Sequence, residues 1–206
     1  MTYKIFFKMI KAIIFDWGGV LIDNVDTERR SRITKEIGIS FEKFLKIHKK
    51  IRSDFQKGWT EDEYWEHFYK ELGEPVKKHF LWEPLYKELY RPKEKVLELA
   101  RSLHKKGYKL ALLSNTVKSD MKYLPELKYD FFDVVVASCE EGIRKPEREI
   151  YDITLERLDV KPEEAVFIDN EMENIDAAKK LGMGTIFFKN VEQLKEELVK
   201  LGVDID

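Results

Sequence analysis

Hydrophobic and polar positions alternate along the chain in blocks that predict strands and helices in turn. Apolar runs of the length and β-branched character of buried parallel strands occur at five places, the residues before Asp16, 109–113, 134–137, 165–168 and 185–188. Segments with apolar residues at helical spacing separate the later runs, at 96–103, 147–158, 174–181 and 191–201. Because parallel strands need crossover connections, the alternation predicts an α/β fold with a doubly wound, parallel five-stranded, Rossmann-like core.

One long region interrupts this alternation. Between residues 24 and 91 the apolar spacing is helical throughout, and the expected helices cover 28–37, 40–51, 60–72 and 82–90. No stretch in this region has the pattern of a strand. We therefore predict an all-helical insert over 24–91 within a core domain formed by 1–23 and 92–206.

Composition limits the classes of partner. The 206 residues suffice for one core domain with a smaller module, and 43% hydrophobic residues can form a sizeable core. A net charge of −2 gives no bulk attraction to nucleic acid or to an anionic membrane. The single Cys139 cannot form an intramolecular disulfide. We expect a cytoplasmic protein with a small-molecule partner and neither a nucleic acid nor a membrane partner, and the sequence does not indicate an oligomeric state.

Reactive side chains follow four of the predicted strands. Asp16 ends KAIIFD, Ser114 ends KLALLS, Lys145 follows VVVASCEEGIR, and Asp169 and Asn170 end AVFIDN. In open parallel sheets, ligands bind in the crevice at the carboxyl ends of the strands. The sequence therefore predicts that these side chains converge on one site.

Each of these residues has a functional and an ordinary interpretation. Asp16, before two glycines, is a candidate nucleophile or metal ligand, or it belongs to a strand-ending turn. Ser114 is a candidate ligand for oxyanions, or an N-cap. Lys145 is a candidate for charge neutralisation, or a surface lysine. Asp169 and the acidic run after it suit a hard cation or a helix N-terminus. Their occurrence together favours function.

The four segments FDWGGVL, LLSNT, GIRKP and FIDNEMENIDAA resemble, in order and spacing, the four motifs of the haloacid dehalogenase-like (HAD) hydrolase superfamily. The helical insert resembles the cap of its phosphatase-like subgroup. This resemblance implies hydrolysis of a small phosphorylated substrate through an aspartyl ester on Asp16, with Ser114 and Lys145 binding the phosphoryl group. It also implies a Mg²⁺ cofactor held by Asp16, the Gly18 carbonyl, and Asp169 or Asn170.

Two positions depart from the family pattern. Gly18 stands where family phosphatases usually carry a second Asp, their general acid, and this loss should slow substrates with poor leaving groups. Asn170 stands where a metal-binding Asp is usual, which should weaken Mg²⁺ binding. A non-catalytic phosphate-ligand binding protein and a metal-independent 2-haloacid dehalogenase therefore stay as alternatives.

Substrate contacts are expected from the strand ends and from the insert. Gly18, Gly19 and Asn115 are expected to bind substrate with backbone and amide groups. Trp17, beside the nucleophile, is expected to line the site, and Trp59 in FQKGWTEDE to stack on the substrate or to anchor the insert. The basic run 29–32 is expected to be a solvated helix face.

Overall fold

The fold centres on a parallel sheet. The computed structural model describes residues 9–77, 82–127 and 129–205. Five strands lie in the order β3-β2-β1-β4-β5, and every neighbouring pair is parallel. The strands are β1 (Ala12–Phe15), β2 (Lys109–Ser114), β3 (Val134–Ala137), β4 (Ala165–Asp169) and β5 (Gly184–Phe187). The predicted five-stranded α/β core is thus confirmed, with bounds that differ by a residue or so.

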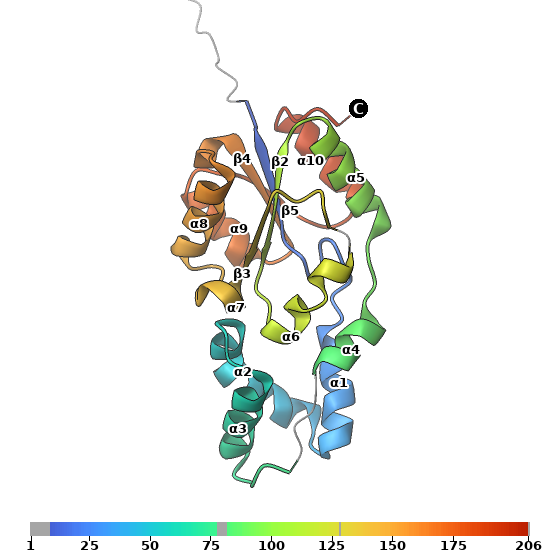
Figure 1. Ribbon diagram of the computed structural model, residues 1–206, viewed down its shortest axis with the longest axis vertical. Coiled ribbons are helices and arrows are strands. Elements are labelled where there is room, and N and C mark those ends of the chain that lie inside the picture. Colours follow the sequence, from blue (N-terminus) through green and yellow to red (C-terminus); the bar gives the residue numbers. More distant parts are fainter. Residues whose placement is uncertain (1–8, 78–81, 128, 206) are drawn as a thin grey trace, which may run out of the picture.

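Helices cover both faces of the sheet because strand side chains alternate between them. Ile13 and Phe15 pack with α5 (Glu94–Lys105) and α10 (Val191–Lys200), whereas Ala12 and Ile14 pack with α8 (Arg148–Leu158) and α9 (Met172–Lys180). Figure 1 shows these two pairs of helices on opposite sides of the strands. Both faces of β1 are therefore buried, which explains its unbroken apolar sequence.

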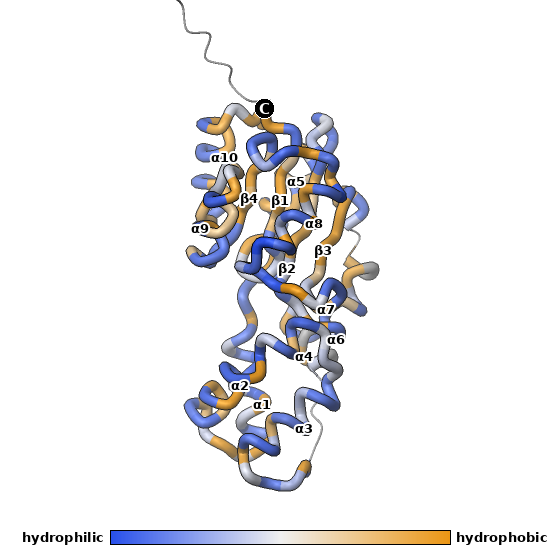
Figure 2. The backbone as a smooth tube through the Cα atoms, turned by 90° about the vertical axis from the view of Figure 1, so that its left-hand side faces the viewer, coloured by the Kyte–Doolittle hydropathy of each residue, from blue (hydrophilic) through white to orange (hydrophobic). Residues whose placement is uncertain are grey.

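The described part of residues 24–91 forms four helices beyond one end of the sheet, at the bottom of Figure 1. They are α1 (Asp26–Ile37), α2 (Phe41–Gln56), α3 (Glu61–Leu72) and α4 (Trp82–Leu89). Their apolar faces meet in a cluster separate from the two sheet clusters. Figure 2 shows hydrophobic positions along these helices, apart from those of the strands. The described residues of 24–91 thus contain helices and no strand, and the division into a core and a cap domain stays a prediction.

Helix α2 is longer than the sequence predicted. Phe44, Ile47, Ile51 and Phe55 continue one buried face past the expected end at residue 51. Ser40 begins this helix, because its side chain accepts a hydrogen bond from a backbone amide one turn later. The extension brings the end of α2 to the core domain.

Short helical turns complete the core. Two were not expected from the sequence, α6 (Lys118–Met121) and α7 (Ser138–Glu141), and two 3-10 turns cover Leu124–Leu127 and Pro162–Glu164. Each has four residues or fewer, too few to show a helical period. None of the helices in the described ranges is both long and apolar enough to cross a membrane. Residues 1–8, the first part of the predicted core domain, lie outside the described residues.

The end of α2 contacts the core closely. Ser138 Oγ donates to the Gln56 carbonyl at 2.6 Å, and Lys57 pairs with Glu147 at 2.8 Å. Gly58 has φ +116°, and a Cβ there would lie 2.8 Å from the carbonyl oxygen of Cys139. Only a glycine permits this approach without a shift of one backbone.

We predict that Gly58→Ala lowers the free energy of unfolding by about 2 kcal/mol, because it adds a steric clash to an unfavourable φ. Gly107→Ala is the matched control, since Gly107 also has a positive φ (+92°) but a Cβ there meets nothing within 4 Å. Chemical denaturation measures both variants. Equal losses would show that the contact with Cys139 does not matter.

Candidate active site

The carboxyl ends of the central strands bring the predicted residues together. Phe15 pairs in register with Leu112 of β2 and Ile168 of β4. The residues that follow these three therefore lie side by side at the carboxyl edge of the sheet. Asp16 is held there by its amide, which donates to the Ile168 carbonyl at 2.9 Å. Asp16 and Ser114 are both buried and both line one cavity.

Lys145 is the centre of the site. Its side chain is 1% exposed, and its Nζ donates to Asp16 Oδ1 at 2.6 Å, to Asp169 Oδ2 at 2.7 Å and to the Leu113 carbonyl at 2.9 Å. A buried ammonium is stable only when its charge and donors are satisfied, and here three acceptors satisfy it. The lysine thus joins the ends of β1, β2 and β4.

Asp169 has no free carboxylate oxygen. Oδ1 accepts from the Glu171 amide at 2.7 Å, while Oδ2 accepts from Asn174 Nδ2 at 3.0 Å as well as from Lys145. The residue is fully buried and does not line the cavity. Its contacts make Asp169 a partner that positions Lys145.

Asn115 holds the main chain that carries Lys145. Its Oδ1 accepts from the Lys145 amide at 2.8 Å, and its Nδ2 donates to the Lys145 carbonyl at 2.9 Å. Two bonds to one residue fix the orientation of the GIRKP loop against the end of β2. Asn115 therefore lines the cavity and also sets the position of the lysine.

The charges in this cluster perturb one another. Burial raises the pKa of Asp16 to about 7; the Lys145 ammonium opposes this rise and the Asp169 carboxylate adds to it. Burial acts to lower the pKa of Lys145, but the two carboxylates outweigh it and hold the value above normal. The two pKa shifts have a common cause, because one ammonium is shared between two carboxylates. Lys145 therefore stays charged, whereas its charge offsets only part of the rise in the pKa of Asp16.

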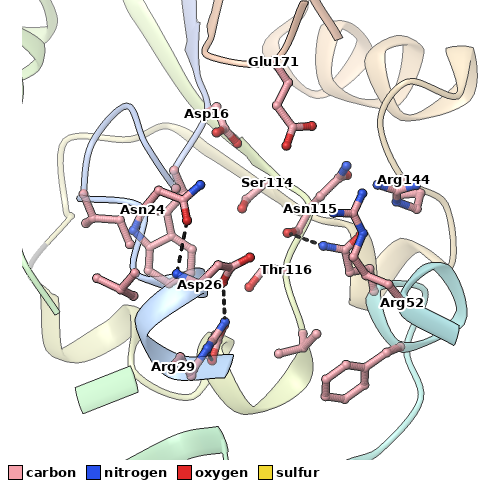
Figure 3. A pocket seen from close by; sticks show the side chains of 18 of the residues that line it. Asp16, Asn24, Asp26, Arg29, Arg52, Ser114, Asn115, Thr116, Arg144 and Glu171 are labelled. Atoms are coloured by element: carbon pink, nitrogen blue, oxygen red, sulfur yellow. Dashed lines mark hydrogen bonds and ion pairs between the residues drawn. The ribbon is translucent and has the colours of Figure 1, made fainter. Parts of the chain in front are cut away.

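A cavity of about 130 Å³ opens beside Asp16, large enough for a small ligand. One wall comes from the core, including Ser114, Asn115 and Lys145, and the other comes from the insert, including Arg29 and Arg52. Figure 3 shows Asp16 and Glu171 at one end and Arg29 at the other. The helical insert thus encloses the carboxyl edge of the sheet.

The structure separates the other predicted residues into two groups. Trp17 and Gly18 line the cavity. Gly19 and Trp59 are not among the lining residues, and Trp59 stacks on His67 with ring centroids 4.1 Å apart. Asn170 also lies outside the lining, with its side chain packed against Gly19.

The residues near Asp16 fit a hard cation only partly. Asn170 Oδ1 is buried and has no hydrogen-bond partner in the described part of the chain, as expected of an oxygen reserved for a ligand. Within the same ranges no cluster of three or more His, Cys, Asp or Glu side chains could hold a metal ion. A Mg²⁺ ion would therefore depend on Asp16, Asn170 and the Gly18 carbonyl, which are oxygen donors with a single carboxylate.

Several lining residues were not predicted. Arg29 was expected on a solvated face, and this expectation is wrong, because Arg29 is 7% exposed and donates to Asp120 at 2.9 Å and to Asp26 at 2.9 Å. Its acidic partner Asp120 is 91 residues away, which no local pattern reveals. Arg144 also lines the cavity, and its position next to Lys145 in GIRKP was the available signal.

Comparison with known proteins defines the class. The family model for haloacid dehalogenase-like hydrolases matches residues 10–182, and the chain belongs to this family of hydrolases. A sesquiterpene phosphatase of Aspergillus oryzae is 31% identical over 179 residues, which cover 84% of this chain and 87% of that protein. Glyceraldehyde 3-phosphate phosphatase of Methanothermobacter thermautotrophicus is 35% identical over 108 residues, 50% of this chain and 48% of that protein.

A solved structure has the same fold. It is a HAD family enzyme from Bacteroides thetaiotaomicron, in an aspartate-to-alanine mutant form complexed with magnesium and inorganic phosphate. The TM-score is 0.71 at 28% identity, over 90% of this chain and 98% of that chain. Magnesium is therefore a ligand of a structural relative in this family.

We predict a pH-dependent contribution of Asp16 to stability in the absence of divalent cations. Between its ordinary pKa of 3.8 and the folded value of about 7, the folded protein holds a proton that the unfolded chain has lost. Stability from this group therefore falls as pH rises through that window. As pH rises through this window, the free energy of unfolding of Asp16→Asn should therefore increase relative to that of the wild type, by up to about 1.4 kcal/mol per pH unit. Denaturation in chelator from pH 4 to 7 tests this, and a constant difference would contradict it.

Proposed function

We propose that the chain hydrolyses phosphomonoesters of small metabolites through an aspartyl-phosphate on Asp16. The observation that carries the proposal is Lys145, fully buried between Asp16 and Asp169 at the floor of a ligand-sized cavity. Relatives named as phosphatases support the same reaction. A phosphorylated sugar is one substrate that this cavity suits.

In the first step, an Asp16 carboxylate oxygen attacks phosphorus and the bond to the leaving-group oxygen breaks. Lys145 and the Ser114 hydroxyl lie where they can offset the charge of the phosphoryl oxygens. In the second step, water attacks the aspartyl-phosphate, which releases phosphate and regenerates the carboxylate. Mg²⁺, held by Asp16, Asn170 and the Gly18 carbonyl, would neutralise charge on the phosphoryl group.

The leaving group receives little help with its proton. A side chain at Gly18 would enter open space, since a Cβ there meets nothing within 4 Å. General acid catalysis is worth about 10²- to 10⁴-fold in rate, so its loss favours acyl, aryl and sugar 1-phosphates over simple alkyl phosphates. Residues 24–91 act in this proposal as a cap domain that closes over the cavity and excludes water.

We predict that hydrolysis of acetyl phosphate and p-nitrophenyl phosphate requires Mg²⁺ and falls by at least about 1000-fold in Asp16→Asn, because an amide is a poor nucleophile. Phosphate release from these compounds and from a sugar-phosphate panel, with Mg²⁺ and with chelator, measures this. Activity that survives Asp16→Asn would refute the mechanism. Phosphate binding without turnover would indicate a binding protein, and turnover of 2-haloacids a dehalogenase.

A series at position 170 tests the metal site. Mg²⁺ affinity should rise in the order Asn170→Ala, wild type, Asn170→Asp, with about a tenfold gain for the carboxylate, because Mg²⁺ prefers anionic oxygen ligands. Calorimetry in the presence of phosphate measures the affinity without turnover. The same affinity in all three proteins would show that position 170 does not contact the ion.

A further inference from the structure

Two arginines face the cavity from different parts of the chain. Arg52 comes from α2 in the insert, and Arg144 comes from the core loop that also carries Lys145. Both side chains are half-buried. Figure 3 shows them on the same side of the cavity, beyond Asn115 and away from Asp26.

The other cations of the cavity have partners. Lys145 is paired with two carboxylates, Arg29 with Asp120, and Arg30 with Asp26. Each of these three cations is therefore already paired with at least one carboxylate of the protein.

Arg52 and Arg144 differ from these residues. Within the described ranges neither guanidinium makes a hydrogen bond or an ion pair, and the buried Arg144 Nε has no acceptor. Burial lowers the pKa of Arg144, repulsion from Arg52 lowers it further, and Glu171, Glu147 and Glu173 oppose this. The two guanidinium groups are therefore close enough to repel each other.

Two like charges kept together in a partly dry cavity are costly unless an anion lies between them. A guanidinium presents a planar fork of donors that matches carboxylate and phosphate oxygens. The phosphoryl group expected at Asp16 already has Lys145 and Ser114 beside it. The arginine pair is thus suited to a different anionic group of the same molecule.

We propose that Arg52 and Arg144 bind a second anionic group of the substrate, a carboxylate or a phosphate, while the reacting phosphoryl group lies at Asp16. This inference rests on the proposed phosphatase function and narrows its substrates to phosphomonoesters with an additional negative charge. Because Arg52 belongs to the insert and Arg144 to the core, the bound anion would also connect the two parts of the chain.

Binding of non-hydrolysable phosphonates tests the site without turnover. The probes are propylphosphonate, 3-phosphonopropionate and propane-1,3-diphosphonate, with longer homologues of each, measured by calorimetry. The wild type should bind one of the doubly anionic classes at least about 10-fold tighter than the alkylphosphonate of matched length. A preference for the carboxylate or for the second phosphonate identifies which anion the arginines take.

Substitutions then test whether Arg52 and Arg144 cause this preference for a second anion. Arg52→Gln and Arg144→Gln should each reduce it to less than about 3-fold, whereas Arg52→Lys and Arg144→Lys should retain part of it. Arg148→Gln is the control, because that arginine is 73% exposed on its side chain and pairs only with Asp152 in the described structure. Thermal melting verifies that each variant is folded.

Two results would overturn the inference. The first is a wild type with no preference for a second anion, which is decisive even if the glutamine variants do not fold. The second is an equal loss for all probes in the glutamine variants, which would assign the arginines to the reacting phosphoryl group. A preserved preference in a protein without phosphatase activity would refute the proposed function and leave the second anion site standing.

Discussion

The buried contact of Lys145 with Asp16 and Asp169 is the constraint on which the rest of the site depends. A fully buried ammonium must have partners, and the available partners lie at the ends of three different strands. The sheet register that aligns those strand ends is therefore part of the site. Asn115 extends this dependence, because it fixes the main chain of the lysine against β2.

The cluster has one cation for two carboxylates, so it keeps a net negative charge beside the cavity. Burial and Asp169 together raise the pKa of Asp16 to about 7 despite Lys145. A proton or a bound cation can supply the missing positive charge, and the unpartnered Asn170 oxygen lies in the neighbouring loop. In the proposed mechanism, Mg²⁺ would supply this charge beside Asp16, the pocket-facing carboxylate at the end of β1.

The core of this arrangement was predictable from the sequence, because its residues end apolar runs and parallel strands bring such ends together. Asp16, Ser114 and Lys145 meet as expected. The insert side was not predictable, since its contacts join residues far apart in the chain, as Arg29 and Asp120 do. Trp59 shows the same limit, because only the packed insert places it on His67 instead of in the cavity.

The barrier to hydrolysis is affected both by the absence of a general acid at Gly18 and by the arginines Arg52 and Arg144. Loss of general acid catalysis costs about 3 to 5 kcal/mol in the barrier. Hydrogen bonds to a charged group contribute about 1.5 to 3 kcal/mol each, so two arginines on a remote anion offer a comparable amount. Binding energy from a non-reacting group can orient the phosphoryl group at the nucleophile and lower the barrier in place of an acid. Binding of the second anion by Arg52 and Arg144 would then increase the rate of hydrolysis as well as select the substrate.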